Sequence, residues 1–188
     1  QAARAAELAA PIGSAIAAEQ LKLQAAADDP ELPAVIAAAD AAAREAKAAA
    51  LAGGLTHLLK LRLLPADVRD TDDAPPVPFT YASLDMVIRA RADTGPVPAE
   101  VHLPGQPAQH IAMVRAVKDS AGAIVGFLHG AYSLELLDQA LAAVDAGGAY
   151  LELRQPVPKG EPVVVARAGG TAPPAGIAAA QNPVPGTA

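Results

Sequence analysis

The stretch 109–139 constrains the fold more than any other part of the chain. It reads QHIAMVRAVKDSAGAIVGFLHGAYSLELLDQ: an apolar run, a short polar turn closed by glycine, a second apolar run and an amphipathic segment. The turn from Asp119 to Gly122 suits a type I turn followed by a left-handed glycine, a common closure of β-hairpins. Asp119 can accept hydrogen bonds from the turn backbone, and Gly122 adopts positive φ without a Cβ clash. The sequence therefore predicts adjacent antiparallel strands at 108–117 and 123–132.

Side-chain alternation assigns these two strands to sheet faces, provided that Asp119 lies opposite Ala123. One face then carries Ile111, Met113, Arg115 and Val117 together with Val125, Phe127 and His129. The opposite face carries His110, Ala112, Val114 and Ala116 together with Ile124, Gly126, Leu128 and Gly130. This second face is mostly apolar, and many of its side chains are small, as expected where a helix packs closely.

A helix is predicted directly after the hairpin, at 134–144. Ser133 suits its N-cap, Glu135 is favoured in its first turn by the helix dipole, and Gly147 and Gly148 suit its end. Upstream, two helices are expected within 2–51, separated at 28–33, where Asp29 caps the second helix and Pro30 takes its first position. Further strands are expected at 58–64, 100–103, 150–154 and 163–167, and a further helix at 81–92.

These elements predict an α+β fold, with one antiparallel sheet and long N-terminal helices packed along it. Residues 1–57 form the N-terminal helical segment, residues 58–168 the sheet domain, and residues 169–188 a flexible linker rich in proline, glycine and alanine. Half of the chain is hydrophobic but only 3% is aromatic, so the expected core is built from small and aliphatic side chains.

Composition excludes several classes of function. The net charge of −6, without a cluster of Lys or Arg, argues against a nucleic-acid partner. The chain has no cysteine, so disulfides, thiolate metal sites and cysteine nucleophiles are excluded. No apolar run of about 20 residues is present, so no membrane span is predicted. Because the chain opens on Gln1 rather than methionine, we interpret it as a fragment, and an anchor can precede it.

No residue pattern predicts catalysis or a metal site. His57, His102, His110 and His129 lack HxH or HxxxH spacing, which favours ordinary buried or surface histidines over a metal centre. The acidic stretch of 67–73 lacks the glycine and closing glutamate of a calcium loop, which favours a solvated loop. We therefore expect no catalytic residue, no metal and no cofactor in this chain.

A long N-terminal helix, then strand–DxxG turn–strand–helix–strands, resembles the extracytoplasmic Cache (PDC, PAS-like) sensor domains of bacteria. The runs PAEVHLPGQPAQHIAMVRAVKDSAGAIVGFLHGAYSL and LLKLRLLP more narrowly resemble the N-terminal region of long-form bacterial phosphomannomutase/phosphoglucomutase. That resemblance implies a membrane-anchored, periplasmic accessory domain of a phosphohexomutase. The phosphoserine loop and the DGD metal loop of that isomerase family are missing here, so we expect the fragment itself to be no enzyme.

Cache domains bind small ligands between the sheet and its covering helices. The resemblance therefore implies a pocket lined by the polar residues best placed for it: Tyr81, Arg89, His110, Arg115, His129 and Tyr132. Arg115 lies in line with apolar residues, so its guanidinium needs an anionic partner. That partner is either a carboxylate of the chain, such as Glu100 or Asp85, or an anionic ligand.

The sequence is compatible with two classes of function. The first is a sensor module in which a small, anionic ligand biases the helical segment. The second is a structural module that forms a homodimer through the N-terminal helices or docks to an envelope protein, without a ligand. The low aromatic content favours the second class, and the Cache resemblance favours the first.

Overall fold

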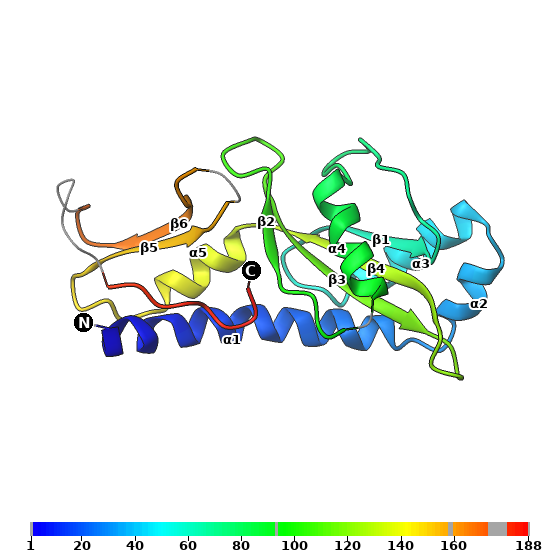
Figure 1. The fold of residues 1–188 in the computed structure, drawn as a ribbon, viewed down its shortest axis with the longest axis horizontal. Helices are drawn as coiled ribbons and strands as arrows, with labels where there is room; N and C mark the ends of the chain where they lie inside the picture. Colours follow the sequence, from blue (N-terminus) through cyan, green and yellow to red (C-terminus); the bar gives the residue numbers. More distant parts are fainter. Residues whose placement is uncertain (1, 93, 158–159, 173–179, 188) are drawn as a thin grey trace.

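The computed structural model describes residues 2–92, 94–157, 160–172 and 180–187. Its longest element is α1 (Ala2–Ala27), which by the rise of an α-helix is about 39 Å long. Figure 1 shows α1 running along most of the molecule, with a four-stranded sheet over one half and a two-stranded sheet over the other. No helix in the described ranges is long and apolar enough to cross a membrane.

Two shorter helices follow α1, where the sequence predicted one. They are α2 (Leu32–Ala37) and α3 (Ala41–Ala52), and the single predicted helix is therefore wrong. The break occurs because the Asp40 side chain accepts hydrogen bonds from the N–H groups of Ala42 and Ala43, at 2.9 and 3.3 Å, and so begins a new helix. Asp29 accepts from the N–H of Glu31, and α2 begins at Leu32, not at Pro30 as predicted.

The main sheet contains β1 (Leu58–Pro65), β2 (Glu100–His102), β3 (His110–Lys118) and β4 (Ile124–Tyr132). All pairs are antiparallel, in the order β1-β4-β3-β2. The predicted β3–β4 hairpin is confirmed. The Asp119 carboxylate accepts from the N–H groups of Ala121 and Ala123, both at 2.9 Å, and Gly122 has a φ of 82°.

The predicted assignment of sheet faces is only half correct, because the register shifts by one residue near the turn. Lys118 opposes Ile124 as predicted, but Val117 opposes Gly126, so Val125 has no counterpart on β3. Beyond this irregularity Arg115 opposes Leu128 instead of sharing a face with Phe127 and His129. Such a bulge exchanges the faces of all following residues on one strand.

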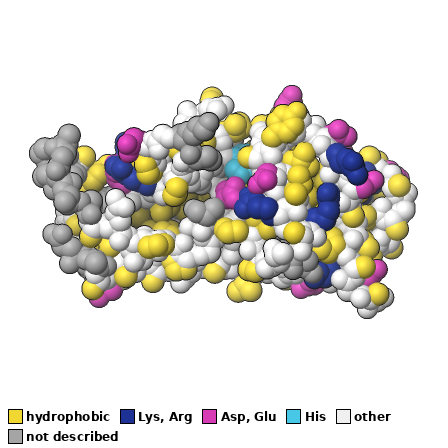
Figure 2. Space-filling model, in the orientation of Figure 1, with side chains coloured by type: hydrophobic (Ala, Val, Ile, Leu, Met, Phe, Trp, Pro, Cys, Tyr) yellow, Lys and Arg dark blue, Asp and Glu magenta, His cyan; other side chains and the backbone are white. Residues whose placement is uncertain are grey.

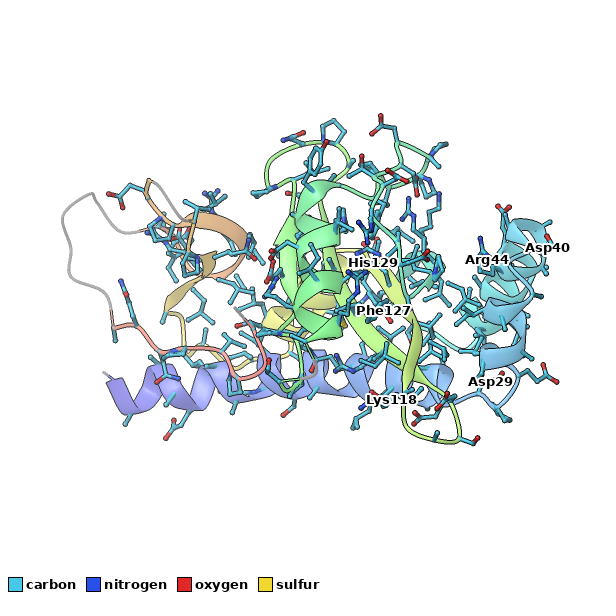
Figure 3. The ribbon with its side chains drawn as sticks, turned by 45° about the vertical axis from the view of Figure 1, so that its right-hand side comes forward. Asp29, Asp40, Arg44, Lys118, Phe127 and His129 are labelled. Atoms are coloured by element: carbon cyan, nitrogen blue, oxygen red, sulfur yellow. The ribbon has the colours of Figure 1, made fainter. Side chains whose placement is uncertain are left out.

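The helices cover both faces of the main sheet, and we name each face by its main helix. On the α1 face, α1, α2 and α3 pack over a core that contains Ile111, Met113, Val117, Leu128 and Tyr132. On the α4 face, α4 (Tyr81–Arg91) packs over Val114 and Phe127, with Phe79, Met86 and Val87. Figure 3 shows Phe127 and His129 on the side of β4 where α4 lies.

The expected single sheet is wrong, because in the described part of the chain the last two strands pair only with each other. They are β5 (Tyr150–Gln155) and β6 (Val163–Gly169). Between the two sheets lies α5 (Glu135–Ala142), which is shorter than predicted. The helix begins at Glu135 with Leu134 as its N-cap, not Ser133 as predicted, although the Ser133 hydroxyl accepts from the N–H of Glu135 at 3.2 Å. α5 contacts both α1 and β6, so its apolar face joins the two halves.

The described end of the chain runs beside α1. The N–H of Ala99 donates to the carbonyl of Gly186 at 3.0 Å, and a Cβ on Gly13 of α1 would lie 3.0 Å from Pro185. Part of the expected linker, residues 173–179 and 188, lies outside the described residues. The fold is thus α+β, with its long helix under both sheets.

Candidate functional site

The six residues expected to line one pocket lie on three separate surfaces. Tyr81 begins α4 and is 80% exposed. Arg89, on the same helix, pairs with Asp85 at 2.9 Å and with Glu100 at 2.5 Å. The other four lie on the main sheet: His110 and His129 on the α4 face, and Arg115 and Tyr132 on the α1 face. The structure therefore does not bring the six together.

The histidines of the α4 face are buried in the interior. The His129 ring lies edge-on to Phe79 at 5.1 Å, and neither of its ring nitrogens has a hydrogen-bond partner among the described residues. His110 donates from Nδ1 to the carbonyl of Ala108 at 2.9 Å. Burial lowers the pKa of His110 to about 4 and that of His129 well below its ordinary value. Both are therefore neutral near pH 7.

His102, which was not predicted as a site residue, opposes His110 across the β2–β3 ladder. The two rings meet at 5.4 Å, and the hydroxyl of Ser83 lies 3.2 Å from Nδ1 of His102. Pairing between strands that are separated by a loop leaves no signal in local alternation. In the described part of the chain no three His, Asp or Glu side chains are placed to hold a metal ion.

Arg62 is the second overlooked residue of the α4 face. Its guanidinium donates to both carboxylate oxygens of Asp72, at 2.9 and 3.0 Å, and to the carbonyl of Val77 at 2.6 Å. It also lies over the Phe79 ring, 5.8 Å from its centroid. Asp72, expected in a solvated acidic loop, is therefore part of an ion pair that holds this loop on the sheet.

A groove of about 610 Å³ lies beside β3, within the range of roughly 300–1,000 Å³ that is typical of ligand sites. Its lining residues come from the end of α1, from α4 and the segment after it, and from β3: Gln24, Asp28, Ala90, Gly95, Pro96, Val97, Val114, Arg115, Ala116, Lys118 and Asp119. Of the six expected site residues, only Arg115 lines this groove. Figure 3 shows Lys118 near the tip of the β3–β4 hairpin, on the side where α1 ends.

The groove follows an edge of β3 where no strand is paired. Gln155 binds both the N–H and the C=O of Val101, so these groups point away from β3. Because backbone groups alternate in direction along a strand, the ladder with β2 uses His110 and Ala112 of β3. As this alternation continues along β3, the N–H and C=O groups of Val114 and Ala116 also point to the side on which β2 lies. They lie past Glu100, the first residue of β2. The described residues provide no strand to pair with them there.

Arg115 lies at this open edge without a carboxylate. Its Nη1 donates to the carbonyl of Val114 at 2.8 Å, and among the described residues it forms no ion pair. The partners suggested by the sequence, Glu100 and Asp85, both bind Arg89, so this structural role for Arg115 is wrong. Burial lowers the pKa of the Arg115 guanidinium, as expected for a partly desolvated cation that lacks an anion.

Tyr132 lies inside the α1 face, near the charges of Glu19 and Arg115. Burial, followed by the nearby Glu19, raises the pKa of the Tyr132 hydroxyl, and Arg115 partly opposes this. The Tyr132 hydroxyl and the Glu19 Oε2 both lack a hydrogen-bond partner among the described residues. Glu19 is anchored through its other oxygen, which accepts from Lys22 at 2.6 Å.

Comparison of the chain with protein-family models, with curated proteins and with solved structures finds no match. The candidate site is therefore defined by its geometry alone. It combines a guanidinium with unused hydrogen-bonding capacity, an unpaired strand edge and apolar walls at Ala90 and Val97. Because the lining also holds the carboxylates of Asp28 and Asp119, the part of the groove suited to binding an anion is that around Arg115.

Proposed function

We propose that this chain is a non-catalytic binding domain of the sensor type, which takes a small anionic ligand in the groove beside β3. The observation that carries the proposal is Arg115, a partly buried guanidinium in a groove of about 610 Å³ with no carboxylate partner among the described residues. An arginine has five N–H donors, and the bond to Val114 uses one of them. The others can form a bidentate pair with a carboxylate or phosphate.

The wider assignment rests on the resemblance to Cache sensor domains and to the N-terminal region of long-form phosphomannomutase/phosphoglucomutase. In this proposal the chain is the periplasmic accessory region of a membrane-anchored phosphohexomutase. The antiparallel sheet with helices on both faces is compatible with that assignment. Ligand occupancy of the groove would act on α1, because Gln24 and Asp28 line the groove at the C-terminal end of this helix.

A thermal-shift screen of organic acids, sugar phosphates and amino acids tests the binding function. A ligand that binds only the native state stabilises it by about 2.7 kcal/mol at a concentration 100 times its Kd. We expect an anion to raise the melting temperature of the wild-type chain and not that of Arg115→Met. Arg69→Met is the matched control, because Arg69 is exposed and does not line the groove. Equal shifts in all three proteins, or none, would contradict the proposal.

The alternative is a structural module without a ligand, favoured by exposed apolar side chains on two helices. Leu21 on α1 is 71% exposed, and Tyr81 and Ile88 share the outer side of α4, where Figure 2 shows apolar side chains on the surface. A homodimer through the N-terminal helices would cover Leu21. Sedimentation equilibrium of the wild type and of Leu21→Glu tests this. If Leu21→Glu dissociates a dimer and no anion of the thermal-shift screen binds the wild type, the structural module replaces the sensor proposal.

A further inference from the structure

We propose that the ligand of the groove is an extended peptide that adds a strand to β3, with its C-terminal carboxylate on Arg115. This inference rests on the proposed function, because it names the class of anion that the same groove binds. It goes further, because it requires the backbone of the ligand to bind as well as its charge.

The strand edge provides what a peptide backbone needs. The segment from Val114 to Lys118 spans roughly 14 Å at the rise of a β-strand, which suits a peptide of about three to four residues. The N–H groups of Val114 and Ala116 and the C=O of Ala116 point into the groove, as in an antiparallel ladder, whereas the C=O of Val114 already accepts from Arg115. A small anion would leave the groups of Ala116 unpaired, whereas an added strand would satisfy them.

The position of Arg115 favours a terminal carboxylate over a side-chain acid. Its guanidinium is bonded to the carbonyl of Val114, so it lies along the strand edge rather than over the middle of a sheet face. A carboxylate that meets it there lies in line with the backbone of an added strand. With its carboxylate on Arg115, the peptide would have its C-terminus at the Val114 end of the edge, next to β2, and its N-terminus near Lys118. It would therefore run antiparallel to β3.

The other edge of the main sheet is less suited to a peptide. It belongs to β1, on which α3 packs and which ends in Pro65. Lys60 of this strand reaches across to the carbonyls of Ala74 and Pro75, at 3.1 and 3.0 Å, and so ties the loop to the strand. A lysine and a proline on an edge strand are typical protections against strand addition.

Titration of the ¹⁵N-labelled chain followed by NMR tests the inference, with acetyl-Val-Ala-Val free acid as the probe. Concentrations of up to about 10 mM detect affinities in the millimolar range. We expect shifts and slowed hydrogen exchange at the amides of Val114 and Ala116. The C-terminal amide form of the peptide should bind roughly tenfold or more weakly, and Arg115→Met should abolish the difference between acid and amide.

Single N-methylation of the probe separates strand addition from simple anion binding. Methylation at amides that face β3 should abolish binding, whereas methylation at the alternate amides should not. If isobutyrate binds as well as the peptide and methylation has no effect, the strand inference is wrong and the anion function stands. If neither the peptide acid nor any anion of the thermal-shift screen binds, both are overturned.

Discussion

The side chain of Gln155 pairs with the backbone of Val101 as a neighbouring strand would. Its Nε2 donates to the carbonyl at 2.8 Å, and its Oε1 accepts from the N–H at 2.6 Å. This is a direct hydrogen-bonded link between the β5–β6 hairpin and β2 of the main sheet. Since Gln155 covers the outer edge of β2, it also prevents another strand from pairing there.

Gln155→Glu should therefore loosen the contact between the two sheets. A carboxylate can still accept from the N–H of Val101 but cannot donate to the carbonyl of this buried residue. We expect a loss of about 1–3 kcal/mol in the free energy of unfolding, measured from the urea midpoint. Gln139→Glu, at an exposed position of α5, should change it by less than about 0.5 kcal/mol. Equal changes in the free energy of unfolding for Gln155→Glu and Gln139→Glu would show that Gln155 does not stabilise the contact between the sheets.

Two arginine-to-methionine substitutions should differ in their effect on stability. Arg62→Met removes the ion pair with Asp72 and the bond to Val77, so we expect a loss of about 2–4 kcal/mol. Arg115→Met breaks no ion pair among the described residues and leaves an apolar side chain in a partly buried place, so stability should change little or rise. A large fall in the urea midpoint of Arg115→Met at unchanged slope would show that Arg115 is structural.

Glycine is required at position 126, where β4 passes close to its neighbours. A Cβ there would lie 2.5 Å from the carbonyl oxygen of Leu64 and 2.6 Å from the side chain of Ile36. Because the backbone of β1 cannot move freely, Gly126→Ala should cost about 1–3 kcal/mol. Gly54→Ala is the control, since its nearest neighbour would lie 3.7 Å away. Thermal melts of both variants compare them, and an unchanged melting temperature for Gly126→Ala would refute the close approach.

Stability should fall as the pH drops from about 6.5 to 4. The pKa of His110 is lowered to about 4, and that of His129 lies well below its ordinary value, so the unfolded chain binds their protons first. Stability is fully present above the unfolded pKa of about 6.5 and is lost as the pH falls towards the folded pKa, by at most about 1.4 kcal/mol per pH unit for each histidine.

His129→Leu should flatten this dependence, because it removes one of the two groups. Urea midpoints between pH 6.5 and 5 measure the effect in a window above the ordinary pKa of glutamate, 4.5, where Glu100 contributes little. The same slope in the variant and in the wild type would show that His129 does not titrate in this way.

Proline substitutions at two adjacent positions of β3 test which backbone N–H groups of this strand point into the groove. Ala116→Pro removes an N–H that points into the groove, so the β3–β4 ladder should remain and the melting temperature should change little. Val117→Pro removes an N–H directed at β4, so we expect a loss of about 3 kcal/mol or more. If Ala116→Pro destabilises the chain more than Val117→Pro, the N–H groups of β3 alternate in the opposite sense. The N–H of Ala116 is then not available to a ligand.

Much of the local structure could be predicted from the sequence. The β3–β4 turn depends on Asp119 and Gly122, and its hydrogen bonds span at most four residues. The strand β1 follows from a mostly apolar run bounded by turn residues, and the helix α4 from the helical spacing of its buried residues Ser83, Met86, Val87 and Ala90. Predictions of this kind hold because the atoms involved are neighbours along the chain.

What the sequence by itself determined is therefore the kind and order of most elements and the closure of one hairpin. The tertiary structure decided the rest. The irregularity at Val125 set which face Phe127 and His129 occupy, the separation of β5–β6 from the main sheet followed from pairing across the chain, and Arg89 rather than Arg115 received Glu100. These outcomes depend on contacts between distant segments, whose register a local pattern does not specify. The open edge of β3, and with it the candidate site, exists because β2 begins only at Glu100, opposite Ala112.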